Sequence, residues 1–182
     1  MTDVDFGDVD FQELLVLYVV MLGGRHPKAK IEVHDVVFVF GENLPQLFPQ
    51  LRQEWFGAAE GLHIDSWMAV DGVDNYKISL SNEAPAAKEP RLFFINLGGY
   101  QAGHFGEEHS YLLVVAEDKV SAKQKGKTIL ATQLATQWEK PHTDNLWDVD
   151  DCIAIDQLDG RYIKLSIEPH QGITQQNDYI LL

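Results

Sequence analysis

The chain has 182 residues, of which 45% are hydrophobic, a share typical of a globular protein. Asp and Glu number 28 against 14 Lys and Arg, so the formal net charge is −14 at pH 7. This charge argues against binding to nucleic acid or to an anionic membrane, because Lys and Arg supply most of the affinity for phosphate groups. The single cysteine, Cys152, excludes an internal disulfide and has no zinc-type Cys or His spacing around it. We therefore expect a protein of the reducing cytoplasm.

The N-terminal residues favour the same location. Residues 1–13 are rich in Asp and Glu, which is the opposite of the basic start of a signal peptide. The apolar run Leu14–Leu22 that follows is far shorter than the ~20 residues needed to span a bilayer. We expect an acidic tail and no membrane segment.

A sequence motif occurs twice in the rest of the chain. Leu22–Gly24 and the Glu32–His34 that follows it return as Leu97–Gly99 and Glu107–His109, at a constant offset of 75 residues. Apolar runs precede and follow both copies. The repetition predicts an internal duplication, which has to be recognised before any fold is assigned.

The first copy reads as two strands, a helix and two more strands, from β-branched runs and then leucines at helical spacing. In chain order we expect strands Leu14–Met21 and Glu32–Phe40, a helix over 44–56 capped by Asn43, and strands Trp67–Val70 and Tyr76–Leu80. The double glycine is expected to end the first strand in a tight turn.

The second copy repeats this order. Its clearest elements are strands Arg91–Asn96 and Glu107–Ala116 and a lysine-bearing helix that Asp118 caps. The expected divisions are an acidic tail 1–13, a first repeat 14–80, a linker 81–90, a second repeat 91–166 and a C-terminal extension 167–182, in which Tyr179–Leu182 adds a strand. The fold class predicted is α+β, with two tandem β-β-α-β-β repeats, mixed sheets, one principal helix on each, and a pseudo-two-fold relation between the repeats.

The predicted topology gathers unusual side chains at one rim of each sheet. An antiparallel first pair puts the double glycine beside Glu-x-His, and a right-handed crossover to a parallel third strand returns the chain to the same rim at His-x-Asp. The candidate ligand-binding residues are Gly23, Gly24, Glu32, His34, His63 and Asp65 in the first repeat, and Gly98, Gly99, Glu107, His109, His142 and Asp144 in the second.

Two imidazoles and two carboxylates allow several kinds of chemistry. They could hold a divalent ion such as zinc, manganese or iron, or act as a general acid and base without a metal. In the plainer interpretation, which the frequency of such residue pairs favours, each histidine bonds a neighbouring carboxylate and ties loops to the sheet rim. The sequence leaves these alternatives open.

The connection after the first double glycine is basic in the first copy only. It carries Arg25, His26, Lys28 and Lys30, whereas the second copy has Tyr100 and Gln101 where the first has Arg25 and His26. A solvated basic loop is the favoured interpretation over an anion-binding nest.

The stretch LGGRHPKAKIEVHDVVF, residues 22–38, resembles an uncharacterised bacterial family, the domain of unknown function number 1543. The resemblance implies one or two copies of the domain per protein and covers about 15–80 and 91–166. The second repeat departs from it by lacking the Arg-His-Pro of residues 25–27. No activity is implied.

Two functions follow as hypotheses. The first is a small binding or structural module, monomer or homodimer, whose small-molecule or protein partner is not specified by the sequence. The alternative is a metal-assisted hydrolase or isomerase that uses the repeated His and carboxylate groups.

Overall fold

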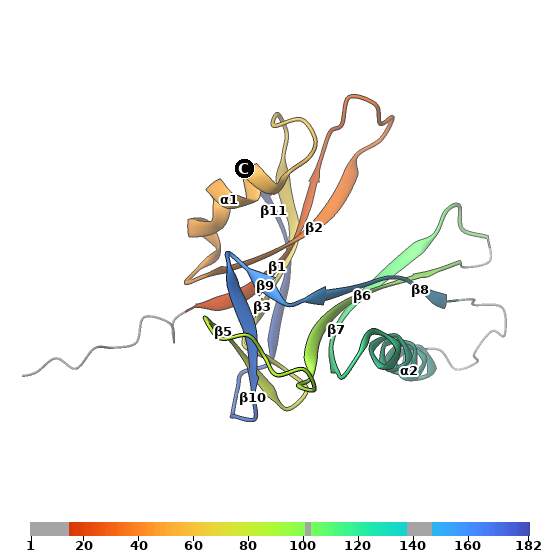
Figure 1. Ribbon diagram of the computed structural model, residues 1–182. Coiled ribbons are helices and arrows are strands. Elements are labelled where there is room, and N and C mark those ends of the chain that lie inside the picture. The colour runs from red at the N-terminus through yellow and green to blue at the C-terminus, as the bar shows by residue number, and fades with distance from the viewer. Residues whose placement is uncertain (1–14, 101–102, 138–146) are drawn as a thin grey trace, which may run out of the picture. The chain divides into compact units, whose positions relative to one another are not determined.

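The computed structural model describes residues 15–100, 103–137 and 147–182 and shows an α+β protein that is mostly antiparallel sheet (Figure 1). In chain order its elements are β1 (Val16–Gly24), β2 (Val33–Gly41), the 3-10 helix η2 (Leu44–Leu47), α1 (Phe48–Glu54), β3 (His63–Val70), β4 (Gly72–Val73), β5 (Tyr76–Ser81), β6 (Arg91–Gly99), β7 (Glu108–Ala116), α2 (Lys119–Gln137), β8 (Trp147–Ile155), β9 (Gln157–Leu158), β10 (Arg161–Ser166) and β11 (Ile173–Leu181). Neither described α-helix is long and apolar enough to cross a membrane.

The chain forms two compact units. Unit 1 comprises the described residues through Gly72, the short segment Ile78–Leu80 and the C-terminal His170–Leu182; unit 2 comprises Val73–Lys77 and Ser81–Pro169. Most of the C-terminal extension, from His170 onward, therefore belongs to the first unit.

The sheet of unit 1 has the order β11-β3-β1-β2. Its central strand β1 is almost wholly apolar, and η2 and α1 supply leucines that pack on it. The core consists of Tyr18, Val20, Leu22, Val37, Val39, Leu44, Leu47, Leu51, Trp55, Leu62 and Ile64. The helical segment starts where the sequence predicts, because Oδ1 of Asn43 accepts the backbone N–H of Gln46 at 3.3 Å.

The sheet of unit 2 has the order β7-β6-β8, and α2 packs against these strands. Oδ1 of Asp118 accepts the backbone N–H of Ser121 at 2.7 Å and so caps α2, as the sequence predicts. The core consists of Phe93, Ile95, Leu97, Val114, Ala122, Leu130 and Cys152. Cys152 is a packing residue of this core, and burial raises the pKa of its thiol.

The prediction of mixed sheets is wrong. Every neighbouring pair in these two sheets is antiparallel, because the third strand of each unit pairs with the first strand instead of the second. The connection through α1 passes over β1, so β2 and β3 run in the same direction without touching. β1, the most apolar strand, is thereby paired with a neighbour on both edges, which is the favourable arrangement for a buried strand.

The strand registers of the two units agree. Gly23 lies opposite His34 in the β1–β2 pair, and Gly98 lies opposite His109 in the β6–β7 pair. The register of β1 against β3 shifts between Met21 and Leu22, and that of β6 against β8 shifts between Asn96 and Leu97.

A second register comparison corrects the predicted match of His142 and Asp144 to His63 and Asp65. Gly23 lies opposite His63, and Gly98 lies opposite Asp148, so Asp148 and Asp150 hold the corresponding positions. The offset has grown from 75 to 85 residues between β7 and β8 (34 to 109, then 63 to 148). His142 and Asp144 themselves lie outside the described residues.

Candidate functional site

Four predicted residues of unit 1 come together in the structure. Glu32 precedes β2 and His34 is its second residue, while His63 begins β3 and Asp65 follows two residues later. Both strand starts flank the glycine end of β1, where His34 and His63 lie opposite Gly23 on its two edges. We call Glu32, His34, His63 and Asp65 the first cluster.

The polar atoms of the first cluster lie close to one another. Nε2 of His63 is 3.2 Å from Oδ1 of Asp65 and 3.6 Å from Oε1 of Glu32. Nε2 of His34 is 3.1 Å from Oδ2 of Asp65 and 3.4 Å from the same Glu32 oxygen. One ligand atom each from Glu32, His63 and Asp65 lie mutually within 4.8 Å.

A backbone hydrogen bond fixes the orientation of the His63 ring. Its side chain is 2% exposed, and its Nδ1 lies 2.8 Å from the carbonyl oxygen of Gly61. A carbonyl can only accept, so Nδ1 carries the proton of this bond and Nε2 is left to face the two carboxylates. A histidine held by a backbone carbonyl in this way is the usual arrangement behind a metal ligand.

Gly23 makes room for the cluster. A Cβ atom at this position would clash with Oδ2 of Asp65 and lie 2.7 Å from Nε2 of His63. The prediction of a turn at the double glycine is therefore wrong: Gly23 and Gly24 continue β1, and the absent side chain is needed for close approach. The neighbouring Gly24 lies against Trp55, so the ligand-binding role expected for it has no support in its surroundings.

One oxygen of the first cluster lacks a hydrogen bond. Oδ2 of Asp65 is buried and accepts none from the described residues, although Nε2 of His34 is nearby. A buried carboxylate oxygen without a donor is costly, and each such atom needs an explanation. A cation bound beside Oδ2 of Asp65 would be such an explanation.

Sequence reasoning missed the contribution of the C-terminal strand. The predicted strand at Tyr179–Leu182 is longer than expected, and β11 pairs with β3. Its register shifts between Asn177 and Ile180, and the ring of Tyr179 lies 4.4 Å from that of His63. Only the length and apolar character of 179–182 hinted at this, and nothing in the sequence indicated the partner strand.

Unit 2 holds a second cluster, Glu107, His109 and Asp150, whose ligand atoms also lie within 4.8 Å of one another. A Cβ atom at Gly98 would clash with Asp150 and lie 2.7 Å from Oε1 of Glu107. All three residues are exposed or nearly so, and only one is a histidine. Nδ1 of His109 lies 3.0 Å from Oδ1 of Asn96, which is not part of the cluster.

The counterpart of His63 takes no part in the second cluster. Asp148 is 76% exposed, and its Oδ1 accepts from Nζ of Lys127 at 2.6 Å. This bond to Lys127, with a backbone N–H from Val149, lowers the pKa of the Asp148 carboxyl. Gly99, also expected to bind a ligand, lies against Trp147. The second cluster thus has one histidine where the first has two.

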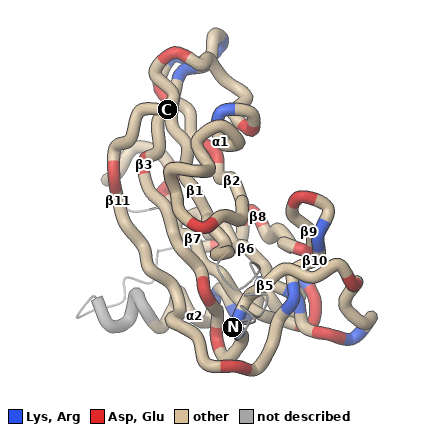
Figure 2. Tube along the Cα trace, turned by 90° about the vertical axis from the view of Figure 1, so that its left-hand side faces the viewer, with Lys and Arg blue, Asp and Glu red and all other residues tan. Residues whose placement is uncertain are grey.

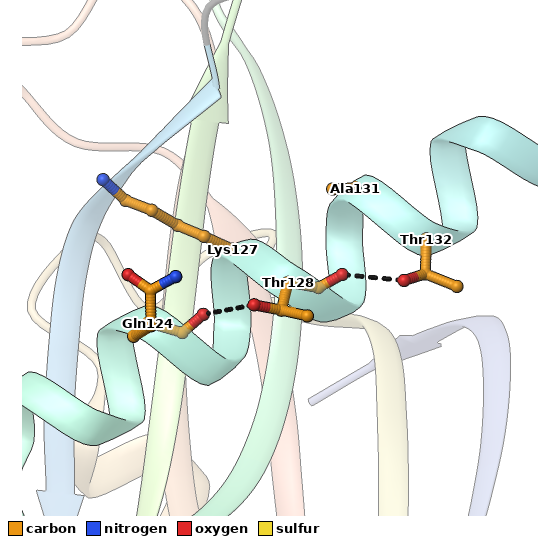
Figure 3. Close-up of a pocket in the computed structure, with 5 residues that line it drawn as sticks. All are labelled: Gln124, Lys127, Thr128, Ala131 and Thr132. Atoms are coloured by element: carbon orange, nitrogen blue, oxygen red, sulfur yellow. Dashed lines mark hydrogen bonds between the residues drawn. The ribbon is translucent and has the colours of Figure 1, made fainter.

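A hollow of about 520 Å³ along α2 is a weaker candidate (Figure 3). The described residues that line it come from a single helix: Gln124, Lys127, Thr128, Ala131 and Thr132. The hydroxyls of Thr128 and Thr132 donate to backbone carbonyls one turn earlier, as the dashed lines in Figure 3 show. Ligand sites gather polar groups from several elements, and this hollow does not.

The fold and the first cluster define the protein as an α+β module with carboxylates and imidazoles gathered over a strand glycine. The crystal structure of a protein Il1583 from Idiomarina loihiensis is similar, with 30% identity over 91% of this chain and 97% of that chain and a TM-score of 0.61. The family model described as Domain of Unknown Function (DUF1543) matches residues 29–80. The chain belongs to the DUF1543 family, which confirms the resemblance found in the sequence for the first copy of the domain.

No curated protein matches the sequence. The matched range 29–80 contains all four residues of the first cluster. The comparisons assign no activity, so any function has to be argued from the cluster itself.

Proposed function

We propose that this protein binds a divalent transition-metal ion at the first cluster. The observation that carries the proposal is the convergence of two imidazoles and two carboxylates over Gly23, where one buried Asp65 oxygen has no hydrogen bond. Nitrogen and carboxylate ligands in this combination suit zinc, manganese or iron.

The spacing of the polar atoms supports a metal. Ligands at about 2.0–2.2 Å from a tetrahedral zinc ion lie roughly 3.3–3.6 Å apart. The four imidazole-to-carboxylate distances in the first cluster run from 3.1 to 3.6 Å. An ion could therefore enter with small movements of side chains.

The competing interpretation is a purely structural set of ion pairs. It requires His63 to keep a proton on Nε2 as well as the one that Nδ1 donates to Gly61, which makes a buried imidazolium. It also leaves Oδ2 of Asp65 with an ion pair to Nε2 of His34 at 3.1 Å but with no hydrogen bond from the described residues. A metal ion removes both difficulties, because it neutralises the carboxylates and accepts the Nε2 lone pair.

Titration of chelator-treated protein with Zn²⁺ or Mn²⁺ tests the proposal. We expect one tight site per chain, lost in the double variant His63→Gln/Asp65→Asn and kept in the matched unit 2 variant His109→Gln/Asp150→Asn. Tight binding should also raise the melting temperature, since 100-fold excess over Kd adds about 2.7 kcal/mol of stability. No uptake, or equal uptake by both variants, would refute the proposal.

A second candidate, metal-assisted hydrolysis, is favoured by the position of His34. It is 48% exposed and touches both carboxylates, yet lies outside the set of three that meet within 4.8 Å. With Glu32, His63 and Asp65 as ligands, an ion keeps an open position for water, and His34 is placed to accept its proton. Hydrolysis of p-nitrophenyl esters by metal-loaded protein, abolished in His34→Gln while metal is retained, would support this role; its absence would leave a binding module.

We also infer that the two repeats, residues 14–80 and 91–166, are tandem copies of one β-β-α-β-β module. The equal registers of the two hairpins and the matched shifts after Met21 and Asn96 support this. So do the left-handed residues Asp74 (φ 57°) and Asp159 (φ 53°), which lie at the corresponding turns. Cross-strand NMR contacts for Gly23–His63 and Gly98–Asp148 test the inference, and a different register in unit 2 would contradict it.

A further inference from the structure

The loop that joins β1 to β2 begins directly after the glycines of the first cluster. We call Arg25–Ile31 the basic loop, because it carries three of the chain's 14 Lys and Arg residues. Arg25, Lys28 and Lys30 are all exposed. Figure 2 shows Lys and Arg beside Asp and Glu at this end of unit 1.

The basic loop is held in place. The backbone N–H of Ala58 donates to the carbonyl of Arg25 at 2.7 Å, and that of Ala29 donates to the carbonyl of His26 at 2.9 Å. The His26 ring lies 5.7 Å from that of Phe56. Its cationic side chains therefore start from fixed backbone positions, which lowers the entropy cost of binding a ligand there.

The sequence separation puts two of the cations within reach of the first cluster. Arg25 lies two residues after Gly23, and Lys30 lies two residues before Glu32. Two residues of extended chain span about 6.6 Å, and Lys and Arg side chains cover a similar length. One small ligand can therefore touch both an ion in the cluster and the loop.

Unit 2 provides an internal comparison. The connection between β6 and β7, residues 100–107, contains no Lys or Arg. The basic loop thus occurs only in the unit whose cluster has two histidines. In a chain of net charge −14, three cations next to the first cluster favour a binding role over the solvated loop that the sequence alone favours.

We propose that the basic loop and the ion of the first cluster together bind a small molecule that carries a phosphate group. The inference rests on the proposed metal site. A divalent ion neutralises the carboxylates of Glu32 and Asp65, and three further positive charges then suit a dianion better than a singly charged carboxylate. The phosphate oxygens contact the ion on one side and Arg25, Lys28 or Lys30 on the other.

Calorimetric titration of zinc-loaded protein with phenyl phosphate tests this. The double variant Lys28→Gln/Lys30→Gln is expected to bind about tenfold more weakly, and binding should weaken as NaCl is raised. Lys88→Gln/Lys164→Gln removes the same charge from exposed positions of unit 2 and should leave affinity unchanged. Benzoate, with one charge, should bind more weakly than phenyl phosphate.

The zinc content of every sample separates the two proposals. Wild-type protein that takes up no zinc contradicts the metal site. Protein that holds zinc but binds phenyl phosphate equally well in wild-type and loop-variant forms, or no better than it binds benzoate, overturns the phosphate inference alone.

Discussion

His63 lies directly opposite Gly23 in the β1–β3 pair, and a Cβ atom at Gly23 would stand 2.7 Å from its Nε2 atom. Glycine is therefore required here because of the side chains above it, and its φ angle plays no part. Gly23→Ala should push His63 and Asp65 apart and cost about 1–3 kcal/mol of stability through overpacking. Zinc affinity should fall with it.

Gly98→Ala is the matched control, because a Cβ atom there would clash with Asp150 of the second cluster. We expect a similar loss in melting temperature with zinc affinity retained. Equal zinc affinity in wild type and Gly23→Ala would show that the first cluster does not depend on this glycine.

The two histidines of the first cluster should behave differently on substitution. His34 is 48% exposed and its contacts with the described residues are ion pairs, so His34→Ala should change the melting temperature of metal-free protein little. His63 is 2% exposed and donates to Gly61, so His63→Ala should cost about 1–3 kcal/mol. His63→Ala should weaken zinc binding at least tenfold, and His34→Ala should weaken it less, because His34 lies outside the set of three ligand atoms. Thermal melts with and without zinc measure the two effects; equal apo destabilisation by both would favour structural ion pairs.

Tyr179 should control how fast the ion leaves. Its ring lies 4.4 Å from that of His63, on the strand that borders β3. Tyr179→Ala should uncover His63 and raise the rate of zinc transfer to a chelator, whereas Tyr179→Phe keeps the ring and should match wild type. Stopped-flow chelation measures the rates, and identical rates for all three proteins would remove Tyr179 from the site.

Asp118 should stabilise α2 in a pH-dependent way. The backbone N–H of Ser121 lowers the pKa of this carboxyl below its ordinary value of 3.8. A carboxyl whose pKa is lower in the folded state adds stability above its unfolded pKa and loses it as pH falls through the folded one. Asp118→Ala should therefore melt below wild type at pH 7, with a gap that narrows below pH 4. Glu117→Ala removes the same charge without the cap and should show no such gap.

The first cluster was predictable because strand geometry constrains it. Residues at i and i+2 of a strand share a face, so Glu32 with His34 and His63 with Asp65 needed only the right strand ends to meet. That condition holds although the prediction of a mixed sheet is wrong. The first residue of β3 lies at the same end of the sheet whether β3 pairs with β1, as in the structure, or with β2, as predicted. A topological error therefore left the site intact.

The site residues of unit 2 were harder to predict from the sequence. His142-x-Asp144 copies the pattern of the first repeat, yet the pairing of β8 depends on hydrophobic register, which puts Asp148 opposite Gly98. Local motifs carry no information about such a shift, because insertions between elements change spacing without changing pattern. For the same reason the sequence could not show that β11 joins the first unit.

The most direct test of the central claim is anomalous X-ray diffraction at the zinc edge from crystals of zinc-loaded protein. We predict a peak between Glu32, His63 and Asp65, with ligand distances of about 2.0–2.2 Å and His34 as a fourth ligand or beside the bound water. A structure with full zinc occupancy elsewhere and none at these residues would contradict the account.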